Sequence, residues 1–270
     1  MTPSDIEAIQ KKYTPEVVST VFRKHDVCVV VPTYNNKHTL FDLLDRIGIY
    51  TDNIWVVDDG STDGTWSLLE QRESVCLNHH ERNLGKGKSL QTAFRGLHQF
   101  EFNYALTIDA DGQHFPEDLP LFAAALEAHP DALIVGSRNL QQANMPGKNT
   151  FANRFSNFWF YLQTGQRLPD TQTGYRLYPL ARMFSGASKI WLPARYEAEL
   201  LLLVQSAWRG IRLQSVPVRV YYPPRGERVS HFRPVADFAR ISLLNTLLCA
   251  GAVVYGFPMR LVRHFKQRKA

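Results

Sequence analysis

The sequence predicts an α/β fold built on a mostly parallel sheet. Short apolar runs rich in β-branched residues alternate with stretches that have helical periodicity. These runs lack strict alternation of apolar and polar residues, which is typical of strands that are buried on both faces. The length of 270 residues, with 44% hydrophobic and 21% charged, fits a folded α/β protein and excludes a disordered or collagen-like chain.

Five strands are expected in the first half of the chain, and a polar loop follows each of them. Helices at residues 40–47 and 89–97 separate strands of this series. Because the carboxyl ends of parallel strands share one edge of a sheet, the loops are expected to line a single crevice. The strands are expected at residues 27–31, 54–57, 74–77, 104–108 and 132–135, and the loops at residues 32–36, 58–65, 81–88, 109–114 and 136–139.

The second half of the chain is expected to cover this sheet. Aromatic helices are predicted at residues 151–161 and 196–208, around a polar segment at residues 168–179, and an alternating strand is predicted at residues 216–222. We divide the chain into a helical extension at residues 1–26, a domain at residues 27–232 with halves at 27–140 and 141–232, and a tail at residues 233–270.

The tail contains 19 uncharged residues, 241–259, just short of the ~20 apolar residues that a membrane-spanning helix needs. Asn245, Gly251 and Pro258 interrupt its apolar character. Arg240 precedes the run and a basic end follows it. We therefore expect an amphipathic helix or helical hairpin that lies on an anionic membrane surface rather than crossing it. A buried core helix with a solvated end is the alternative.

Charge is distributed unevenly along the chain. The 31 Lys and Arg against 25 Asp and Glu give a net charge of +6, but residues 205–270 hold 12 basic and 2 acidic side chains. Such a basic end indicates contact with an anionic surface or ligand. Three widely spaced cysteines without a CxxC motif argue against a disulfide framework or a zinc site. Residues 1–26 contain no secretory apolar run, so we expect a cytoplasmic location.

Asp109 and Asp111 stand two residues apart at the end of an expected strand. In an extended chain this spacing points both carboxylates to the same side, and Gln113 continues the pattern. Two hard oxygen ligands suit Mg²⁺ or Mn²⁺, which binds through one or two carboxylates together with substrate phosphates. Taken alone, the triplet is explained nearly as well by a solvated turn with an Asp cap before Pro116.

Two other loops have distinctive chemistry. Asp58 and Asp59 close the second strand, and one of them is a candidate for a base or ribose contact. Residues 83–88, NLGKGK, suggest a phosphate cradle, but the Walker pattern fails because Arg82 stands where glycine is required. No G-x-G-x-x-G follows the first strand, which disfavours a dinucleotide-binding fold.

Five strings in order resemble the motifs of glycosyltransferase family 2, the inverting enzymes whose nucleotide-sugar-binding α/β fold is called GT-A. The resemblance covers about residues 27–232, and five ordered motifs are far more specific than one. LPDTQTGYRLYP at 168–179 and GERVSHF at 226–232 are similar to later motifs of the polyprenyl-phosphate branch, which is like the dolichyl-phosphate mannose synthases. The five strings are VVVPTYNN, VVDDGSTDGT, NLGKGKSLQTAFRGL, LTIDADGQHFPEDL and VGSRN.

The resemblance implies a donor site built from these motifs. A divalent metal, Mg²⁺ or Mn²⁺, would bridge the diphosphate of the nucleotide sugar, held by Asp109, Asp111 and Gln113. The residues implied around the nucleotide, its phosphates and its sugar are Pro32, Tyr34, Asp58, Asp59, Lys86, Asp109 and Arg138.

An acceptor side is implied as well. Asp170 and Gln172 resemble a pair that shapes the sugar pocket, and Asp170 or Glu197 is the candidate base for a hydroxyl acceptor, with Glu199 less favoured. An acidic first helical turn explains Glu197 and Glu199 equally well. Besides Asp170, Gln172 and Glu197, we expect Asp111 to be needed for catalysis. The residues expected to bind the acceptor are Arg176, which also anchors its segment, and Arg228, Ser230 and His231.

The sequence therefore predicts a metal-dependent, inverting transferase. It would move a hexose from a UDP- or GDP-sugar to a lipid-linked acceptor, such as a polyprenyl phosphate, at the inner face of a membrane. A glycan or another lipid hydroxyl is the alternative acceptor. A sugar nucleotidyltransferase is less favoured, because PTYNN is not the glycine- and arginine-rich loop expected of one. An RNA-binding protein would not need five polar loops at strand ends, so no nucleic-acid partner is expected.

Overall fold

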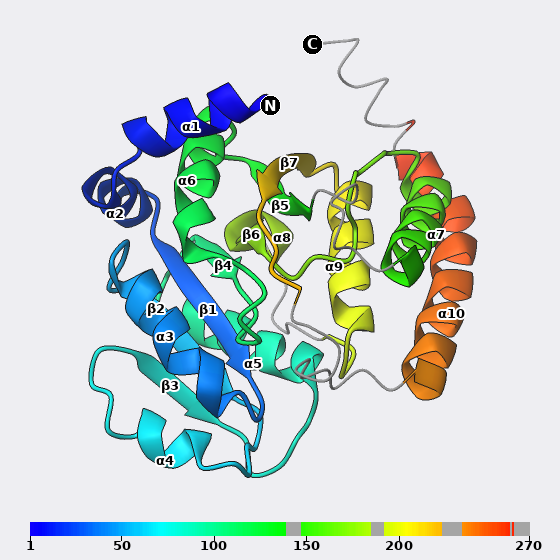
Figure 1. Cartoon of the computed structure of the whole chain (residues 1–270). Helices are drawn as coiled ribbons and strands as arrows, with labels where there is room; N and C mark the ends of the chain where they lie inside the picture. The colour runs from blue at the N-terminus through cyan, green and yellow to red at the C-terminus, as the bar shows by residue number, and fades with distance from the viewer. Residues whose placement is uncertain (139–146, 185–191, 223–233, 260, 262–270) are drawn as a thin grey trace.

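The computed structural model describes residues 1–138, 147–184, 192–222, 234–259 and 261. These residues form a seven-stranded sheet in the order β3-β2-β1-β4-β6-β5-β7, with helices on both faces (Figure 1). The predicted α/β class with a mostly parallel sheet is confirmed. The strands are β1 (Val27–Thr33), β2 (Ile54–Asp58), β3 (Cys76–His79), β4 (Tyr104–Thr107), β5 (Ala132–Arg138), β6 (Arg176–Pro179) and β7 (Arg212–Val218).

Helices cover both faces because successive β1 side chains alternate between two cores. Val27, Val29 and Val31 belong to the core that α2, α3 and α6 complete, whereas Cys28 and Val30 belong to the core that α5 and α9 complete. The helices are α1 (Pro3–Lys12), α2 (Pro15–Lys24), α3 (Lys37–Gly48), α4 (Thr65–Leu69), α5 (Lys86–Gln99), α6 (Leu119–Ala128), α7 (Gly147–Thr164), α8 (Leu180–Met183), α9 (Glu197–Trp208) and α10 (Pro234–Gly251).

Among the described strands, β6 is the one that runs antiparallel to its neighbours, β4 and β5. The chain therefore enters β6 at the edge of the sheet where the parallel strands end. This reversal brings residues 170–174 beside the loops that follow β4 and β5, and the hydroxyl of Thr107 donates a hydrogen bond of 2.7 Å to the carbonyl oxygen of Gly174. The sequence analysis did not identify β6, because its four residues end in proline and carry no clear periodicity.

The predicted strand boundaries differ from the observed ones, and β3 and β7 are shifted along the chain. β3 begins at Cys76 rather than at residue 74, and β7 spans Arg212–Val218 rather than residues 216–222. β7 pairs with β5 from Ala132 to Arg138, so the length of β5 sets the ends of β7. Alternation alone located the strand but not its partner, and the partner decides where an edge strand begins and ends.

The N-terminal helices share a core with the sheet. Val18, Val21 and Phe22 of α2 are at most 4% exposed and pack in the cluster that contains β1 and α6. The helical extension predicted at residues 1–26 therefore packs onto the domain predicted at residues 27–232.

The tail forms a single helix over its described residues, α10 with a π-helical turn (Ala252–Gly256), and it lies beside α7 (Figure 1). Its polar and small residues face the protein. The side-chain amide of Gln163 in α7 donates to Oδ1 of Asn245 at 2.8 Å, and Gly251 and Gly256 pack directly against the indole of Trp208. Thus Asn245, Gly251 and Gly256 lie on the inner face of the helix, whereas Pro258 is exposed.

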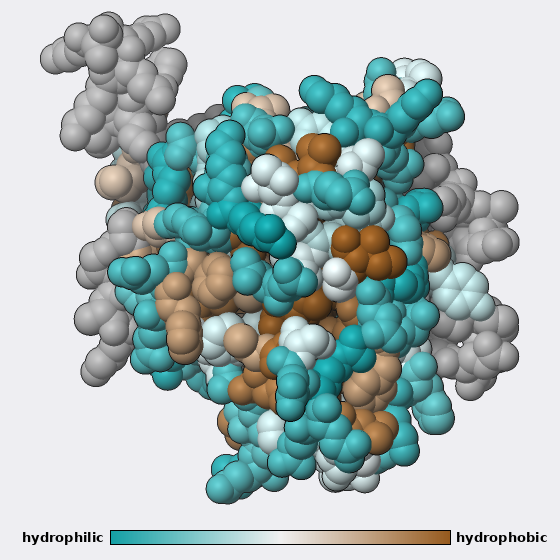
Figure 2. Space-filling model, turned by 90° about the vertical axis from the view of Figure 1, so that its left-hand side faces the viewer, coloured by the Kyte–Doolittle hydropathy of each residue, from teal (hydrophilic) through white to brown (hydrophobic). Residues whose placement is uncertain are grey.

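The outer face of α7 and α10 is apolar and exposed. Leu243 and Leu247 of α10 are 63% and 60% exposed, and Phe158 of α7 is 55% exposed. Ala239–Met259 is long and apolar enough to cross a membrane by length and composition alone. The side of the molecule that carries α2 to α4 is different, because hydrophilic residues dominate it and hydrophobic ones form separate patches (Figure 2). We call the surface formed by Phe158, Leu243, Leu247 and Val254 the outer apolar face.

If α2 is part of the folded core, Phe22→Ala will lower the free energy of unfolding by about 3–5 kcal/mol, because a fully buried phenyl ring leaves a cavity. Val17→Ala on the same helix, where the side chain is 38% exposed, should change it by less than about 0.5 kcal/mol. Urea unfolding measures both. Equal effects of the two substitutions would show that α2 does not contribute to the core.

Candidate active site

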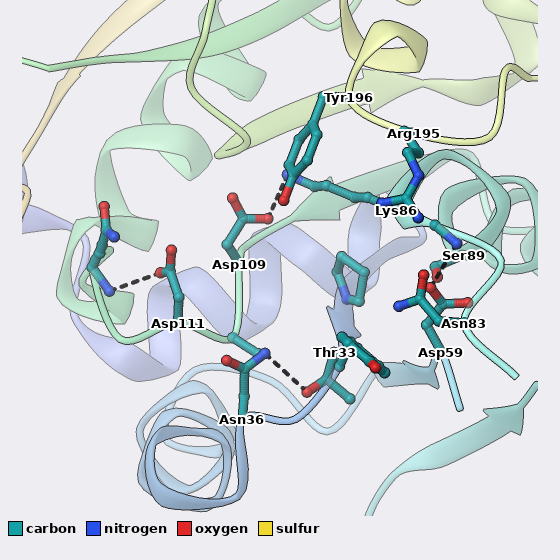
Figure 3. A pocket seen from close by; sticks show the side chains of 15 residues that line it. Thr33, Asn36, Asp59, Asn83, Lys86, Ser89, Asp109, Asp111, Arg195 and Tyr196 are labelled. Atoms are coloured by element: carbon teal, nitrogen blue, oxygen red, sulfur yellow. Dashed lines mark hydrogen bonds and ion pairs between the residues drawn. The ribbon is translucent and has the colours of Figure 1, made fainter. Parts of the chain in front are cut away.

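A cavity of about 240 Å³ opens at the carboxyl ends of β1, β2 and β4 (Figure 3). The topology rule predicted a site at this edge, and seven of the predicted donor-site residues line the cavity: Pro32, Tyr34, Asp59, Lys86, Asp109, Asp111 and Gln113. Five further residues of the predicted loops line it as well: Thr33, Asn36, Asn83, Gly85 and Ala110. Three lining residues lie outside those loops and were not predicted: Ser89, Arg195 and Tyr196.

Lys86 joins three chain segments at this cavity. Its Nζ lies 2.6 Å from Oδ1 of Asp109, which follows β4, and 3.1 Å from Oε2 of Glu199 in the first turn of α9 (Figure 3 shows the Asp109 contact). The Lys86 side chain is only 15% exposed, so the carboxylates compensate for the desolvation of its ammonium. Burial alone would raise the pKa of Asp109, but the Lys86 ammonium and other positive neighbours hold that pKa below its ordinary value.

Asp111 has no cation partner among the described residues. Its Oδ1 accepts a hydrogen bond of 3.0 Å from the backbone N–H of Gln113. Burial and repulsion by Asp109 raise the pKa of Asp111 to about 6. A divalent cation shared by Asp109 and Asp111 would relieve this repulsion, so the pair fits Mg²⁺ or Mn²⁺. No group of three or more His, Cys, Asp or Glu side chains in the described ranges is arranged to hold a metal, so further ligands would come from phosphate or water oxygens.

Asp59 shapes the loop that leads into α5. Its carboxylate accepts hydrogen bonds from the backbone N–H groups of Leu84 and Gly85, at 2.9 and 2.7 Å, and lies 2.7 Å from Nδ1 of His80. These contacts hold the turn that brings Asn83 and Lys86 to the cavity. The histidine, at the end of β3, was not identified from sequence.

Asp58 lies outside the set of residues that line the cavity. Its carboxylate is fully buried, accepts hydrogen bonds from the hydroxyl and backbone N–H of Ser61, and lies 2.8 Å from Nδ1 of His79. Contact with a nucleotide would require these oxygens to exchange partners. Of the two adjacent carboxylates, Asp59 is therefore the one that reaches the cavity, and the nucleotide contact of Asp58 stays a prediction.

The wall opposite Asp59 comes from residues 193–196, just before α9. This segment can approach α5 because Gly85 and Gly87 have no side chains. A Cβ atom on either glycine would collide with the carbonyl oxygens of Pro193 or Ala194, and the backbone N–H of Lys88 donates to the Ala194 oxygen at 3.3 Å. The glycines in NLGKGK thus permit a close chain crossing. The two glycines were visible in the sequence, but the sequence did not show which segment packs against them.

Arg138 and Asp170 neutralise each other away from the cavity. Nε and Nη2 of Arg138 lie 2.6 and 3.0 Å from the two oxygens of Asp170, and the side-chain amide of Asn153 donates to the same carboxylate at 2.6 Å. Burial opposes ionisation of this fully buried acid, but Arg138 holds its pKa below the ordinary value. The guanidinium of Arg138 is engaged by Asp170 in this structure, and its predicted approach to the donor stays a prediction.

Arg176 is engaged inside the protein, and its predicted role in acceptor binding stays a prediction. Its side chain is fully buried, and its guanidinium donates to the carbonyl oxygens of Thr171, Thr173 and Glu199, at 2.9, 2.7 and 2.7 Å. Arg176 connects the polar segment before β6 to α9, which agrees with its predicted role as an anchor of that segment. A guanidinium supplies several donors in a fixed fork, which suits three carbonyl acceptors.

The remaining predicted residues have different positions. Glu197 and Glu199 are both buried, but Glu199, the less favoured of the two, is the one that contacts Lys86. Gln172 is exposed, and its amide donates to the carbonyl oxygen of Ala152 at 3.3 Å. The acceptor residues Arg228, Ser230 and His231 lie outside the described residues.

Gly87→Ala should disturb the cavity, because the new methyl group would push residues 193–195 away from α5. We expect the free energy of unfolding to fall by about 1–3 kcal/mol and the affinity for a nucleoside diphosphate to fall with it. Gly48→Ala is the matched control, since a Cβ there meets nothing within 4 Å. Urea unfolding and calorimetric titration would measure the two effects. Wild-type values for Gly87→Ala would exclude the proposed dependence of the cavity on this crossing.

Curated relatives are similar to this chain over most of their length. A UDP-N-acetylglucosamine–dolichyl-phosphate N-acetylglucosaminyltransferase of Methanococcus voltae is 26% identical, over 73% of this chain and 86% of the relative. An undecaprenyl-phosphate mannosyltransferase of Micrococcus luteus is 29% identical, over 74% of this chain and 86% of the relative.

A solved structure has the same fold. Glucosyl-3-phosphoglycerate synthase from Mycobacterium tuberculosis, in complex with Mn²⁺, uridine diphosphate and phosphoglyceric acid, aligns with a TM-score of 0.65 and 19% identity, over 87% of this chain and 82% of that one. The family model described as glycosyl transferase family 2 matches residues 28–186, more than half of the sequence. The chain therefore belongs to glycosyl transferase family 2, and it is a glycosyltransferase with a GT-A fold.

Proposed function

We propose that this enzyme transfers a hexose from a UDP- or GDP-sugar to a polyprenyl phosphate, with inversion at the anomeric carbon and with a divalent metal. The names of the two curated relatives, which act on dolichyl phosphate and undecaprenyl phosphate, support this acceptor class. The solved relative with Mn²⁺ and uridine diphosphate supports a nucleotide-sugar donor.

The observation that carries the proposal is the combination of Asp109, Asp111 and Lys86 at one cavity. Loss of a nucleoside diphosphate leaves negative charge on the departing phosphate oxygens. Lys86 can stabilise that charge directly, and Asp109 and Asp111 would hold the cation. When bound, the metal acts as a Lewis acid on the leaving diphosphate. If Asp109 binds the metal instead of Lys86, the contact with Glu199 still holds the Lys86 side chain at the cavity.

The chemistry of the candidate base favours a phosphate acceptor. A hydroxyl acceptor needs a carboxylate that can take a proton, but Asp170 is bound by Arg138 and Asn153 and is fully buried. A phosphate monoester has its second pKa near ~6 and is already a nucleophile at neutral pH. No free base is then required, and Asp170 holds Arg138 instead. Catalysis by Glu197, and acceptor binding by Arg228, Ser230 and His231, remain parts of this proposal.

A lipid acceptor also requires contact with a membrane. The outer apolar face offers aromatic and aliphatic side chains to the bilayer interface, and Arg240 with the basic sequence after residue 259 suits anionic headgroups. Because the side-chain amide of Asn245 is bound by Gln163 of α7, the exposed side of the helix can enter lipid without burying an unpaired amide. We propose that the enzyme associates with the cytoplasmic face of a membrane through this surface.

Asp111→Asn should reduce sugar transfer by about 100-fold or more while the fold is kept, because one charge near the metal is lost. The assay is release of nucleoside diphosphate from UDP- and GDP-sugars with Mg²⁺ or Mn²⁺ and a polyprenyl phosphate. Asp52→Asn, whose side chain is 85% exposed, is the control. Near-normal turnover by folded Asp111→Asn enzyme would refute the metal role, and turnover only with a hydroxyl acceptor would refute the phosphate acceptor.

Leu247→Asp should weaken binding to vesicles, since it places a charge on the outer apolar face. Ile49→Asp is the matched control, because both side chains are 60% exposed and Ile49 lies at the end of α3. Flotation with vesicles that contain anionic phospholipid measures bound protein. We expect several-fold less flotation for Leu247→Asp alone. Equal flotation of both variants would exclude this face as the membrane contact.

A further inference from the structure

The amino end of α5 forms a positively charged corner of the cavity. Gly85 and Lys86 at the start of this 14-residue helix both line the cavity. The first N–H groups of a helix carry a partial positive charge, which anions stabilise. The first turn of α5 contains no acidic residue, and no side chain caps it. Asp59 accepts the N–H of Gly85 just before the helix, but no acidic side chain within the first turn of α5 compensates its amino end.

Arg195 adds a second positive charge to this corner. A Cβ built on Gly85 would lie 2.9 Å from Cγ of Arg195, so the stem of the arginine crosses the first residues of α5. In Figure 3 its side chain extends from the segment before α9 toward Lys86 and Ser89. Within the described ranges no hydrogen-bond or ion-pair partner is found for its guanidinium. The carboxylates that could pair with it are engaged, since Asp109 and Glu199 bind Lys86 and Asp59 binds backbone N–H groups.

Ser89 supplies an independent sign of a missing ligand. It lines the cavity from the first turns of α5, it is fully buried, and its hydroxyl has no hydrogen-bond partner. A buried hydroxyl without a partner is costly, so such groups are usually completed by water or a ligand. The Ser89 hydroxyl and the Arg195 guanidinium both offer hydrogen-bond donors beside a positive helix end, and neither has an acceptor among the described residues.

We propose that Arg195 and Ser89 bind a phosphate group at the amino end of α5, and that Arg195 is a substrate-binding residue. This inference rests on the proposed function, because that function supplies the phosphate. Two sources share the chemistry, namely the diphosphate of the donor and the phosphate of the acceptor. A guanidinium can donate two parallel hydrogen bonds to a phosphate, which a lysine cannot do.

The test compares Arg195→Met and Ser89→Ala with the wild-type enzyme. Calorimetry measures binding of UDP, GDP, uridine and guanosine in the presence of Mg²⁺, and steady-state assays give the KM for a polyprenyl phosphate. If the donor diphosphate is the ligand, Arg195→Met should weaken UDP or GDP binding by about tenfold or more and leave nucleoside binding unchanged. If the acceptor phosphate is the ligand, the KM for polyprenyl phosphate should rise similarly. Ser89→Ala should act on the same ligand by a few-fold.

Arg212→Met is the matched control, because Arg212 is exposed at the start of β7, away from the cavity. Thermal unfolding checks that the variants are folded. Unchanged diphosphate affinity and unchanged acceptor KM in folded Arg195→Met enzyme would overturn the inference. A loss of nucleoside and diphosphate binding by the same factor would also overturn it, since phosphate contact would not be the cause. If wild-type enzyme binds neither UDP nor GDP and transfers no sugar, the proposed function fails instead.

Discussion

The arrangement of the site depends on the ion pairs that the buried ammonium of Lys86 makes. It connects the start of α5, the end of β4 and the first turn of α9 through Asp109 and Glu199. A largely buried charge is stable only while its partners remain, so these three segments must stay together. Gly174 packs against the same pair, because a Cβ there would lie within 3 Å of both the Asp109 carboxylate and the Lys86 ammonium. The reversed strand β6 brings this glycine to the site.

The same geometry leaves two groups of opposite charge without ionic partners in the described cavity. Asp111 has a raised pKa and repels Asp109, whereas Arg195 has no anion beside it. A metal bound to a nucleoside diphosphate carries both missing charges in one ligand. We expect the cavity to be complementary to such a complex rather than to a metal or a nucleotide alone, and phosphate oxygens would supply the ligands that the protein does not.

The sequence predicted the parts of this site that are local in the chain. The order of strands and loops placed Pro32, Asp59, Lys86 and Asp109 at one edge of the sheet, because the ends of parallel strands meet there. Arg195 was missed and Glu199 was ranked below Glu197, since their positions depend on a crossing over Gly85 and Gly87 that no local pattern encodes. Arg138 was assigned to the donor from the family resemblance, and no local pattern showed its pairing with Asp170, 32 residues away. In the tail, Asn245 and Gly251 looked like interruptions of the apolar run, whereas in the fold both residues face the protein.

The affinity for Mn²⁺ tests the complementarity of the cavity most directly. It can be measured by electron paramagnetic resonance of free Mn²⁺, with the protein alone, with uridine or guanosine, and with UDP or GDP. Lys86 engages Asp109, and the described residues hold no group of three or more His, Cys, Asp or Glu side chains that could bind a metal. Mn²⁺ should therefore bind weakly to the protein alone or with a nucleoside. With UDP or GDP present, we expect the protein to retain Mn²⁺ at least tenfold more tightly than the free nucleotide does. Equal retention of Mn²⁺ with and without UDP or GDP, after correction for binding by the nucleotide itself, would contradict a cavity built for a metal–diphosphate complex.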